Sequence, residues 1–172
     1  MSKTALLVID VQDSFLQRDY WTDTEFKPYA EKQTRLINHA RANDWQVVYV
    51  LHNESEGVFS PESGFVRLMS FLEPRANEPT FNKHVHNALL ESGLHEWLQA
   101  QGINKLVISG IRTEQCCETT TRVGSDMGYD VDYVLDATLT FPMKHPLTGE
   151  MVSVEAIKSH TALVLSGRFA TI

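Results

Sequence analysis

Four short stretches of the chain are almost continuously apolar. They are rich in Val, Ile, Leu and Tyr, and none of them alternates cleanly between apolar and polar positions. They lie at residues 5–9, 46–51, 105–109 and 131–135. Strands of a parallel sheet that is covered on both faces have this pattern, because both sides of each strand are buried. The four stretches therefore predict a parallel sheet.

Between these stretches, apolar residues recur at helical spacing. The predicted helices occupy residues 29–43, 89–101, 114–127 and 153–165, and a glycine typical of a helix stop follows three of them, at Gly102, Gly128 and Gly167. Strands that alternate with helices predict an α/β fold with right-handed crossovers. We expect one three-layer α/β/α domain over residues 1–172, with a mostly parallel, doubly wound, Rossmann-like sheet. The long irregular segment 52–79 is a candidate wall of an active site.

Length and composition narrow the class of protein. A chain of 172 residues holds one domain with a full core, and its net charge of −7 argues against a nucleic-acid or anionic-membrane partner. No apolar stretch is long enough to span a bilayer, and residues 1–4 lead into the first apolar run without the layout of a signal peptide. Cys116 and Cys117 are adjacent, which makes a structural disulfide a poor interpretation. We therefore expect a reduced, cytoplasmic protein.

Three chemically reactive residues follow predicted strands. Asp10 comes directly after the first apolar run, Lys83 ends a short run at residues 80–83, and Cys116 lies where a helix begins after the third run. Ligands of open parallel sheets bind at the carboxyl ends of the strands. At the start of a helix, free backbone N–H groups favour a thiolate over a thiol. An acid, a cation and a thiol in these places predict nucleophilic catalysis.

Each of these residues also has an ordinary structural interpretation. An Asp at the end of a strand is often a helix cap or a turn former, and a single Lys in a loop is usually on the surface. A Cys in a helix is most often a small buried apolar residue, which is how we interpret Cys117. The pattern alone does not show that the three side chains meet.

Two motifs, in order along the chain, resemble those of the isochorismatase-like cysteine hydrolases. These are residues 7–15, LVIDVQDSF, and residues 110–116, GIRTEQC, with Lys83 between them. That superfamily includes nicotinamidases, N-carbamoylsarcosine amidase-like enzymes and ureide hydrolases, and the similarity extends over nearly the whole chain. The resemblance implies that Asp10, Lys83 and Cys116 form a catalytic triad. It also implies a small-molecule substrate, no nucleic-acid or membrane partner, and a homo-oligomer that is a dimer or larger.

The resemblance also suggests how substrate is bound. Gln12 and Phe15 match the family motif Asp-x-Gln-x-x-Phe, whose Phe ring lines the substrate pocket. Ile111 and Arg112 occupy the position of a cis peptide that turns an N–H group into an oxyanion hole. Five aromatic residues either complete this pocket or pack in the core and lid. They are Phe15, Trp21, Phe59, Phe65 and Phe141.

Three departures from the family pattern limit how far the properties of the family can be assigned to this chain. Nicotinamidases bind a metal through an Asp-x-His motif, and the matching region around His52 has none, while His84 and His86 lack a nearby carboxylate. We therefore expect no metal and no cofactor. After Lys83, residues 87–89 read NAL where the family has Ser-Ala-Phe. The third departure is Arg112, a bulky and charged residue where many relatives have a small one. Arg112 either forms a surface ion pair with Glu114 or Glu118, or grips a substrate carboxylate.

Hydrolysis of a C–N bond in a small amide or ureide, through a thioester on Cys116, is the function that these residues favour. Asp10 would act as general base and acid, and Lys83 as the stabilising cation. The alternatives are an isochorismatase-type vinyl ether hydrolase, which does not need the cysteine, a thiol redox sensor, and a non-catalytic protein that kept the fold.

Overall fold

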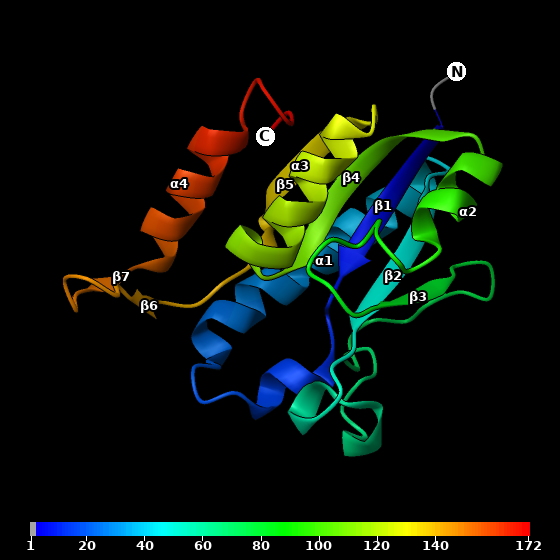
Figure 1. The fold of residues 1–172 in the computed structure, drawn as a ribbon. Coiled ribbons are helices and arrows are strands. Elements are labelled where there is room, and N and C mark those ends of the chain that lie inside the picture. The colour runs from blue at the N-terminus through cyan, green and yellow to red at the C-terminus, as the bar shows by residue number, and fades with distance from the viewer. Residues whose placement is uncertain (1–2) are drawn as a thin grey trace.

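A five-stranded parallel sheet forms the centre of the molecule (Figure 1). The computed structural model describes residues 3–172, so Met1 and Ser2, on which the expectation about a signal peptide partly depends, lie outside the described residues. The strands are β1 (Lys3–Ile9), β2 (Gln46–His52), β3 (Thr80–Lys83), β4 (Ile103–Ile111) and β5 (Asp130–Leu139). Their order across the sheet is β3-β2-β1-β4-β5, so the chain reverses its direction of winding between β1 and β4. Ligands of such sheets bind at this switch point.

Helices cover both faces of the sheet, as the three-layer prediction required. Helix α1 (Asp23–Ala42) lies on one face, and α2 (Leu94–Ala100) and α3 (Glu118–Asp126) lie on the other (Figure 1). Helix α4 (Val154–Leu165) packs beside α3, next to a small antiparallel pair, β6 (Met143–Lys144) and β7 (Met151–Val152). The predicted α/β fold is confirmed. In residues 3–172, no helix is long and apolar enough to cross a membrane.

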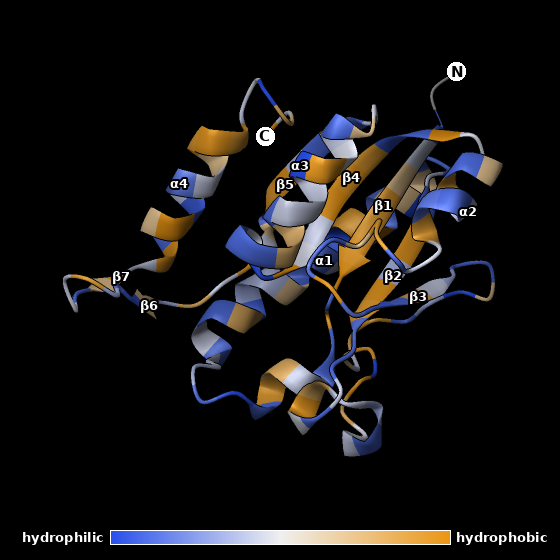
Figure 2. Ribbon diagram, in the orientation of Figure 1, coloured by the Kyte–Doolittle hydropathy of each residue, from blue (hydrophilic) through white to orange (hydrophobic). Residues whose placement is uncertain are grey.

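The unbroken apolar runs have a simple structural cause. Successive residues of β1 point to opposite faces, so Leu7 and Ile9 enter the core under α2 and α3, whereas Leu6 and Val8 enter the core under α1. Figure 2 shows the strands as an apolar layer between helices with polar outer faces. Each fully buried Leu, Ile or Val stabilises the fold by about 1.5–3 kcal/mol. The sheet is thus the main source of stability.

Several helix boundaries differ from the predictions. Helix α1 begins at Asp23 and contains Pro28, because Phe26 and Tyr29 extend its apolar face toward the core. The predicted helix 89–101 is shorter, since Gly93 adopts a left-handed conformation just before α2. The predicted helix 114–127 is divided into a π-type turn, Thr113–Cys117, and α3. The predicted strand 131–135 is part of the longer β5.

Candidate active site

Asp10 follows β1, the central strand of the sheet. Its backbone has a φ of 56°, a left-handed conformation that Asp tolerates better than most residues, and its N–H donates to the Val50 carbonyl oxygen at 2.8 Å. The side chain is only 1% exposed. Such burial is costly for a carboxylate unless a cation lies beside it.

Lys83 supplies that cation from the end of β3. In the sheet register, Lys83 is the partner of His52 on β2, and its side chain is completely buried. The ammonium nitrogen Nζ lies 2.9 Å from Asp10 Oδ2, 3.0 Å from His52 Nδ1 and 3.4 Å from Cys116 Sγ. The contacts with His52 and Cys116 are hydrogen bonds, whereas the contact with Asp10 is an ion pair. Lys83 therefore joins three elements of the fold.

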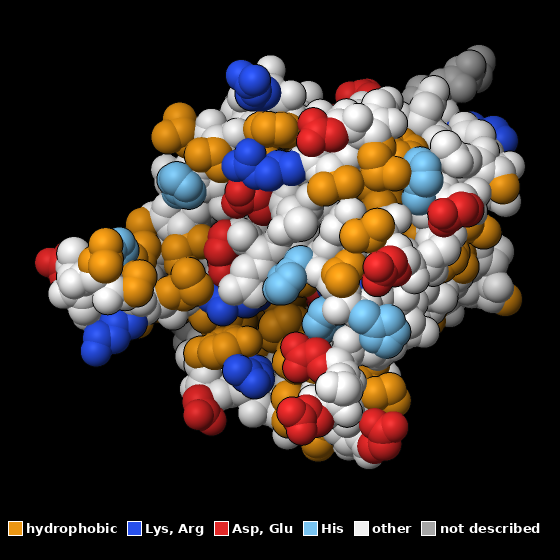
Figure 3. Space-filling model, in the orientation of Figure 1, with side chains coloured by type: hydrophobic (Ala, Val, Ile, Leu, Met, Phe, Trp, Pro, Cys, Tyr) orange, Lys and Arg blue, Asp and Glu red, His pale blue; other side chains and the backbone are white. Residues whose placement is uncertain are grey.

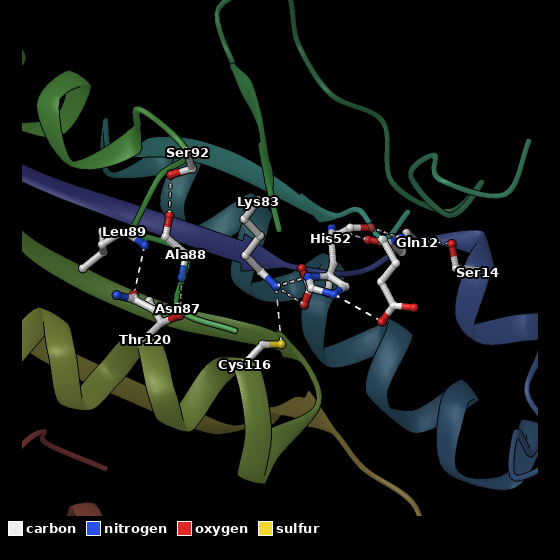
Figure 4. Close-up of polar contacts among 12 residues, drawn as sticks. Gln12, Ser14, His52, Lys83, Asn87, Ala88, Leu89, Ser92, Cys116 and Thr120 are labelled. Atoms are coloured by element: carbon white, nitrogen blue, oxygen red, sulfur yellow. Dashed lines mark hydrogen bonds and ion pairs between the residues drawn. The ribbon is translucent and has the colours of Figure 1, made fainter. Parts of the chain in front are cut away.

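Cys116 lies in the turn Thr113–Cys117, between β4 and α3, and is 7% exposed. The three predicted residues are thus brought together, because Lys83 forms an ion pair with Asp10 and donates to Cys116 (Figure 4). Burial and the nearby Asp10 carboxylate raise the pKa of the Cys116 thiol, and the opposing effect of Lys83 is smaller. The expectation that the helix start favours a thiolate is therefore wrong for the resting site.

The adjacent Cys117 has a different environment. It is fully buried in the core under α2 and α3, where burial raises the pKa of its thiol well above the usual value. Both cysteines are free thiols. The interpretation of Cys117 as a small apolar core residue is confirmed.

Gln12 and His52 form a connection to this site that the sequence did not reveal. The Gln12 side chain accepts from the His52 N–H at 2.7 Å and donates to the His52 carbonyl oxygen at 3.0 Å (Figure 4). The fully buried amide also donates to Ser14 Oγ. Gln12 thereby fixes the end of β2. The Asp-x-Gln motif was the available signal, but its partner lies 40 residues away.

The sequence draws attention to His52 only as a candidate metal ligand. In the structure, its ring contacts charged side chains instead. Its ring nitrogen Nδ1 faces Lys83, and Nε2 lies 3.5 Å from Glu54 Oε1. Burial and Lys83 lower its pKa to about 4. His84 and His86 are exposed. Among residues 3–172, no three His, Cys, Asp or Glu side chains are grouped as a metal site would require.

Comparison with known proteins identifies the family. A sequence model of the isochorismatase domain matches residues 4–167, nearly the whole chain. The chain belongs to the isochorismatase family. It is 27% identical over 172 residues to the uncharacterized isochorismatase family protein YrdC of Bacillus subtilis, a match that covers 99% of this chain and 91% of YrdC.

Two further proteins to which the chain is similar are informative. The ureidoacrylate amidohydrolase RutB of Stutzerimonas stutzeri is 27% identical over 173 residues, covering 80% of this chain and 70% of RutB. The crystal structure of a candidate isochorismatase from Burkholderia xenovorans superposes with a TM-score of 0.86 at 27% identity, over 98% of this chain and 82% of the other. This chain is therefore an isochorismatase-family hydrolase with the fold of its relatives.

The turn before Cys116 has the geometry that the family resemblance implied. The Ile111–Arg112 peptide bond is cis, and the Arg112 carbonyl oxygen accepts from the N–H groups of Gln115 and Cys117. Gly110 precedes this bond with a φ of 129°, and a Cβ atom there would lie 2.0 Å from the Ile9 carbonyl oxygen. Glycine is thus the residue that lets β4 approach β1 at this point.

Arg112 forms an ion pair with Glu114, as one of the two interpretations proposed. Its Nε lies 3.1 Å from Glu114 Oε1, while Glu118 pairs with Arg122 instead. The pair is buried rather than on the surface, which corrects that part of the prediction. The physical reason is that Arg112 packs against segments distant in the chain: Nη2 donates to Thr140 Oγ1 and to the Phe141 carbonyl oxygen, and the guanidinium lies 5.0 Å from the centre of the Tyr20 ring.

The aromatic residues divide into two contacting groups. Phe15 packs edge-on against Phe59, with ring centres 5.0 Å apart, and Phe59 in turn meets the His52 ring. Phe141 packs against Tyr20 and Trp21. Figure 3 shows a hollow with apolar side chains at its floor and histidines beside it, in the region where β1 and β2 end in Figure 1. A separate cavity of about 480 Å³ lies at the opposite, amino end of the strands and contains none of the triad.

Proposed function

We propose that this protein is a cysteine hydrolase that cleaves a C–N bond of a small amide or ureide. The observation that carries this proposal is the Lys83 ammonium, buried between Asp10 at 2.9 Å and Cys116 at 3.4 Å. A nucleophile, a proton acceptor and a fixed cation are the groups that covalent amide hydrolysis needs. Sequence similarity to the ureidoacrylate amidohydrolase of S. stutzeri also supports the proposal that a C–N bond is cleaved.

The proposed reaction proceeds in two halves. Asp10 accepts the proton from Cys116 Sγ while the sulfur attacks the carbonyl carbon of the substrate. This order suits a thiol whose pKa is raised, because the proton leaves as the S–C bond forms. The C–N bond then breaks, and Asp10 returns the proton to the departing nitrogen as ammonia or an amine is released. A thioester remains on Cys116.

Water completes the cycle. Asp10 takes a proton from water, the water oxygen attacks the thioester carbon, and the C–S bond breaks. The sulfur leaves as a thiolate and recovers the proton from Asp10, which restores the starting site. The net reaction consumes one amide and one water and yields one acid and one amine.

The negative charge that develops on the substrate oxygen needs donors that are already in place. We assign this task to two backbone N–H groups, that of Arg112, just before the turn Thr113–Cys117, and that of Cys116 within it. The turn is held by two hydrogen bonds to the Arg112 carbonyl oxygen, from Gln115 and Cys117. Lys83 stabilises the thiolate as it forms and as it leaves.

We assign the walls of the substrate site to Phe15, Ile111, Arg112 and Phe141. The charge of Arg112 is balanced by Glu114, and two of its guanidinium nitrogens already have partners. Arg112 therefore serves as a fixed wall that joins the turn to Phe141, rather than as a free cation for a substrate carboxylate. This favours small substrates without net charge.

Release of ammonia or amine from a panel of small amides and ureides tests the proposal. Cys116→Ala and Asp10→Asn should abolish turnover, and mass spectrometry of the quenched wild-type enzyme should find the acyl group on Cys116. Lys83→Met should slow both turnover and alkylation of Cys116 by removing a favourable charge. Lys105→Met, which changes a lysine paired with Asp132 away from the site, is the control.

Some outcomes would overturn the proposal. Full activity in Cys116→Ala would point to vinyl ether chemistry. A peroxide-dependent loss of thiols without any hydrolysis would point to a redox sensor. The absence of turnover on every substrate, with a folded protein, would favour a non-catalytic member.

A further inference from the structure

Lys83 has a third acceptor that takes no part in the proposed reaction. Its ammonium nitrogen lies 3.0 Å from His52 Nδ1, on the neighbouring strand β2. The ammonium also forms an ion pair with Asp10 and donates to Cys116, the two groups that exchange the proton in the proposed reaction. Because the three N–H bonds of a lysine turn together about its Cε–Nζ bond, fixing the direction of one N–H also fixes the directions of the other two. The histidine thus limits where Lys83 can point.

This contact determines the protonation of the ring. Lys83 can only donate, so Nδ1 must carry a lone pair, and the ring hydrogen must be on Nε2, which faces Glu54 at 3.5 Å. A protonated ring would direct an N–H group at the ammonium and place two positive charges side by side. The other charged or titratable groups near the ring are Asp10, His84 and His86.

The position of His52 is built into the fold. Both of its backbone polar groups are bonded to the buried Gln12 side chain (Figure 4), and its ring meets Phe59 at a centroid distance of 5.9 Å. Its side chain is 13% exposed. A histidine that is held by its backbone, its ring face and Nδ1 has little freedom to turn.

We propose that His52 is a positioning residue, whose neutral Nδ1 takes one N–H of Lys83 and thereby directs the other two at Asp10 and Cys116. Its effect on turnover rests on the proposed function, but its effect on the ring tautomer and on the thiol does not. Gln12 supports it by fixing the end of β2. Acid that protonates His52 removes this acceptor from Lys83, so the same contact makes the orientation of Lys83 sensitive to low pH.

Nuclear magnetic resonance of ¹⁵N-labelled histidine tests the first part without any substrate. The resonances of His52 are assigned as those missing from His52→Asn. They should show a neutral ring with hydrogen on Nε2 at pH 6, where a typical exposed histidine is largely protonated. A ring that is protonated at pH 6, or that carries hydrogen on Nδ1, would overturn the proposal.

Variants test the effect on Lys83 and the thiol. His52→Leu removes the acceptor, whereas His52→Asn keeps an oxygen at the position of Nδ1. The rate of Cys116 alkylation and kcat should each fall by about tenfold in His52→Leu with little change in KM, and should recover to within about threefold in His52→Asn. His86→Asn changes an exposed ring beside His52 that does not contact Lys83, and should behave as wild type.

The two proposals fail in different ways. If no amide or ureide is hydrolysed, the proposed function fails, while the tautomer and the alkylation rates still decide the role of His52. If His52→Leu alkylates and turns over like wild type, His52 has no positioning role, although the cysteine hydrolase stands. Equal losses in His52→Leu and His52→Asn would also contradict it, since only the acceptor distinguishes the two.

Discussion

Cys116 and Cys117 are neighbours in the sequence but differ in their surroundings. Cys116 contacts Lys83, whereas Cys117 lies fully buried in the core. Residues one apart on a helix point about 100° away from each other, so one site can use only one of them. Iodoacetamide followed by mass spectrometry should therefore modify Cys116 first. Cys117→Ala should keep hydrolysis and lower the free energy of unfolding by about 1–2 kcal/mol, through a small cavity. Preferential labelling of Cys117 would contradict this assignment.

His52 should also make stability depend on pH. Folding holds its pKa at about 4, below its usual value of 6.5, because burial and Lys83 disfavour the charged ring. Between these values the unfolded chain binds more protons than the folded one, so acid favours unfolding in this window. From pH 7 to pH 5 this single group should lower the free energy of unfolding by about 2 kcal/mol. Urea unfolding of wild type and His52→Asn at both pH values measures the difference. The same pH dependence in both proteins would contradict the prediction.

At the scale of elements, the close approach of β4 to β1 depends on Gly110. A Cβ atom there would lie 2.0 Å from the Ile9 carbonyl oxygen, and the φ of 129° is itself unfavourable for other residues. Both effects should make Gly110→Ala cost about 3 kcal/mol or more in the free energy of unfolding. Gly128→Ala is the matched control, since Gly128 also has a positive φ, of 91°, but no atom within 4 Å. It should cost only about 1 kcal/mol. Similar costs in the two variants, measured by urea unfolding, would show that the strand contact is unimportant.

At the scale of the whole molecule, we predict that hydrolysis does not depend on a metal ion. His52 Nδ1 is occupied by Lys83, and His84 and His86 are exposed. We predict that EDTA leaves hydrolysis unchanged. Nicotinamide should be a poor substrate, slower by about tenfold or more, because its ring nitrogen would be left without a directed partner. Assays of nicotinamide against small ureides, with and without EDTA, check this. One equivalent of bound zinc, with activity lost on chelation, would contradict the prediction.

The sequence by itself determined the features that depend on near neighbours. Apolar runs indicated the strands because each buried strand needs apolar residues on both faces, and glycines marked where helices stop. Asp10 and Lys83 could be placed at strand ends for the same reason, since Asp10 directly follows a short run and Lys83 ends one, and Cys116 could be placed at the start of the helical segment after a third run. The family motifs then connected these three positions. No such local signal showed that α1 begins at Asp23 or that the turn Thr113–Cys117 is separate from α3.

Only the tertiary structure decided which side chains meet. Lys83 reaches His52 across 31 residues, and Gln12 reaches His52 across 40, because β3, β2 and β1 are adjacent in the sheet. The burial of Arg112 and the raised pKa of Cys116 likewise depend on segments that are distant in the chain. Hydrophobic periodicity is a property of a segment and can be read along the chain. Desolvation and hydrogen-bond partners are properties of the space that several segments enclose, and they exist only once the sheet has formed.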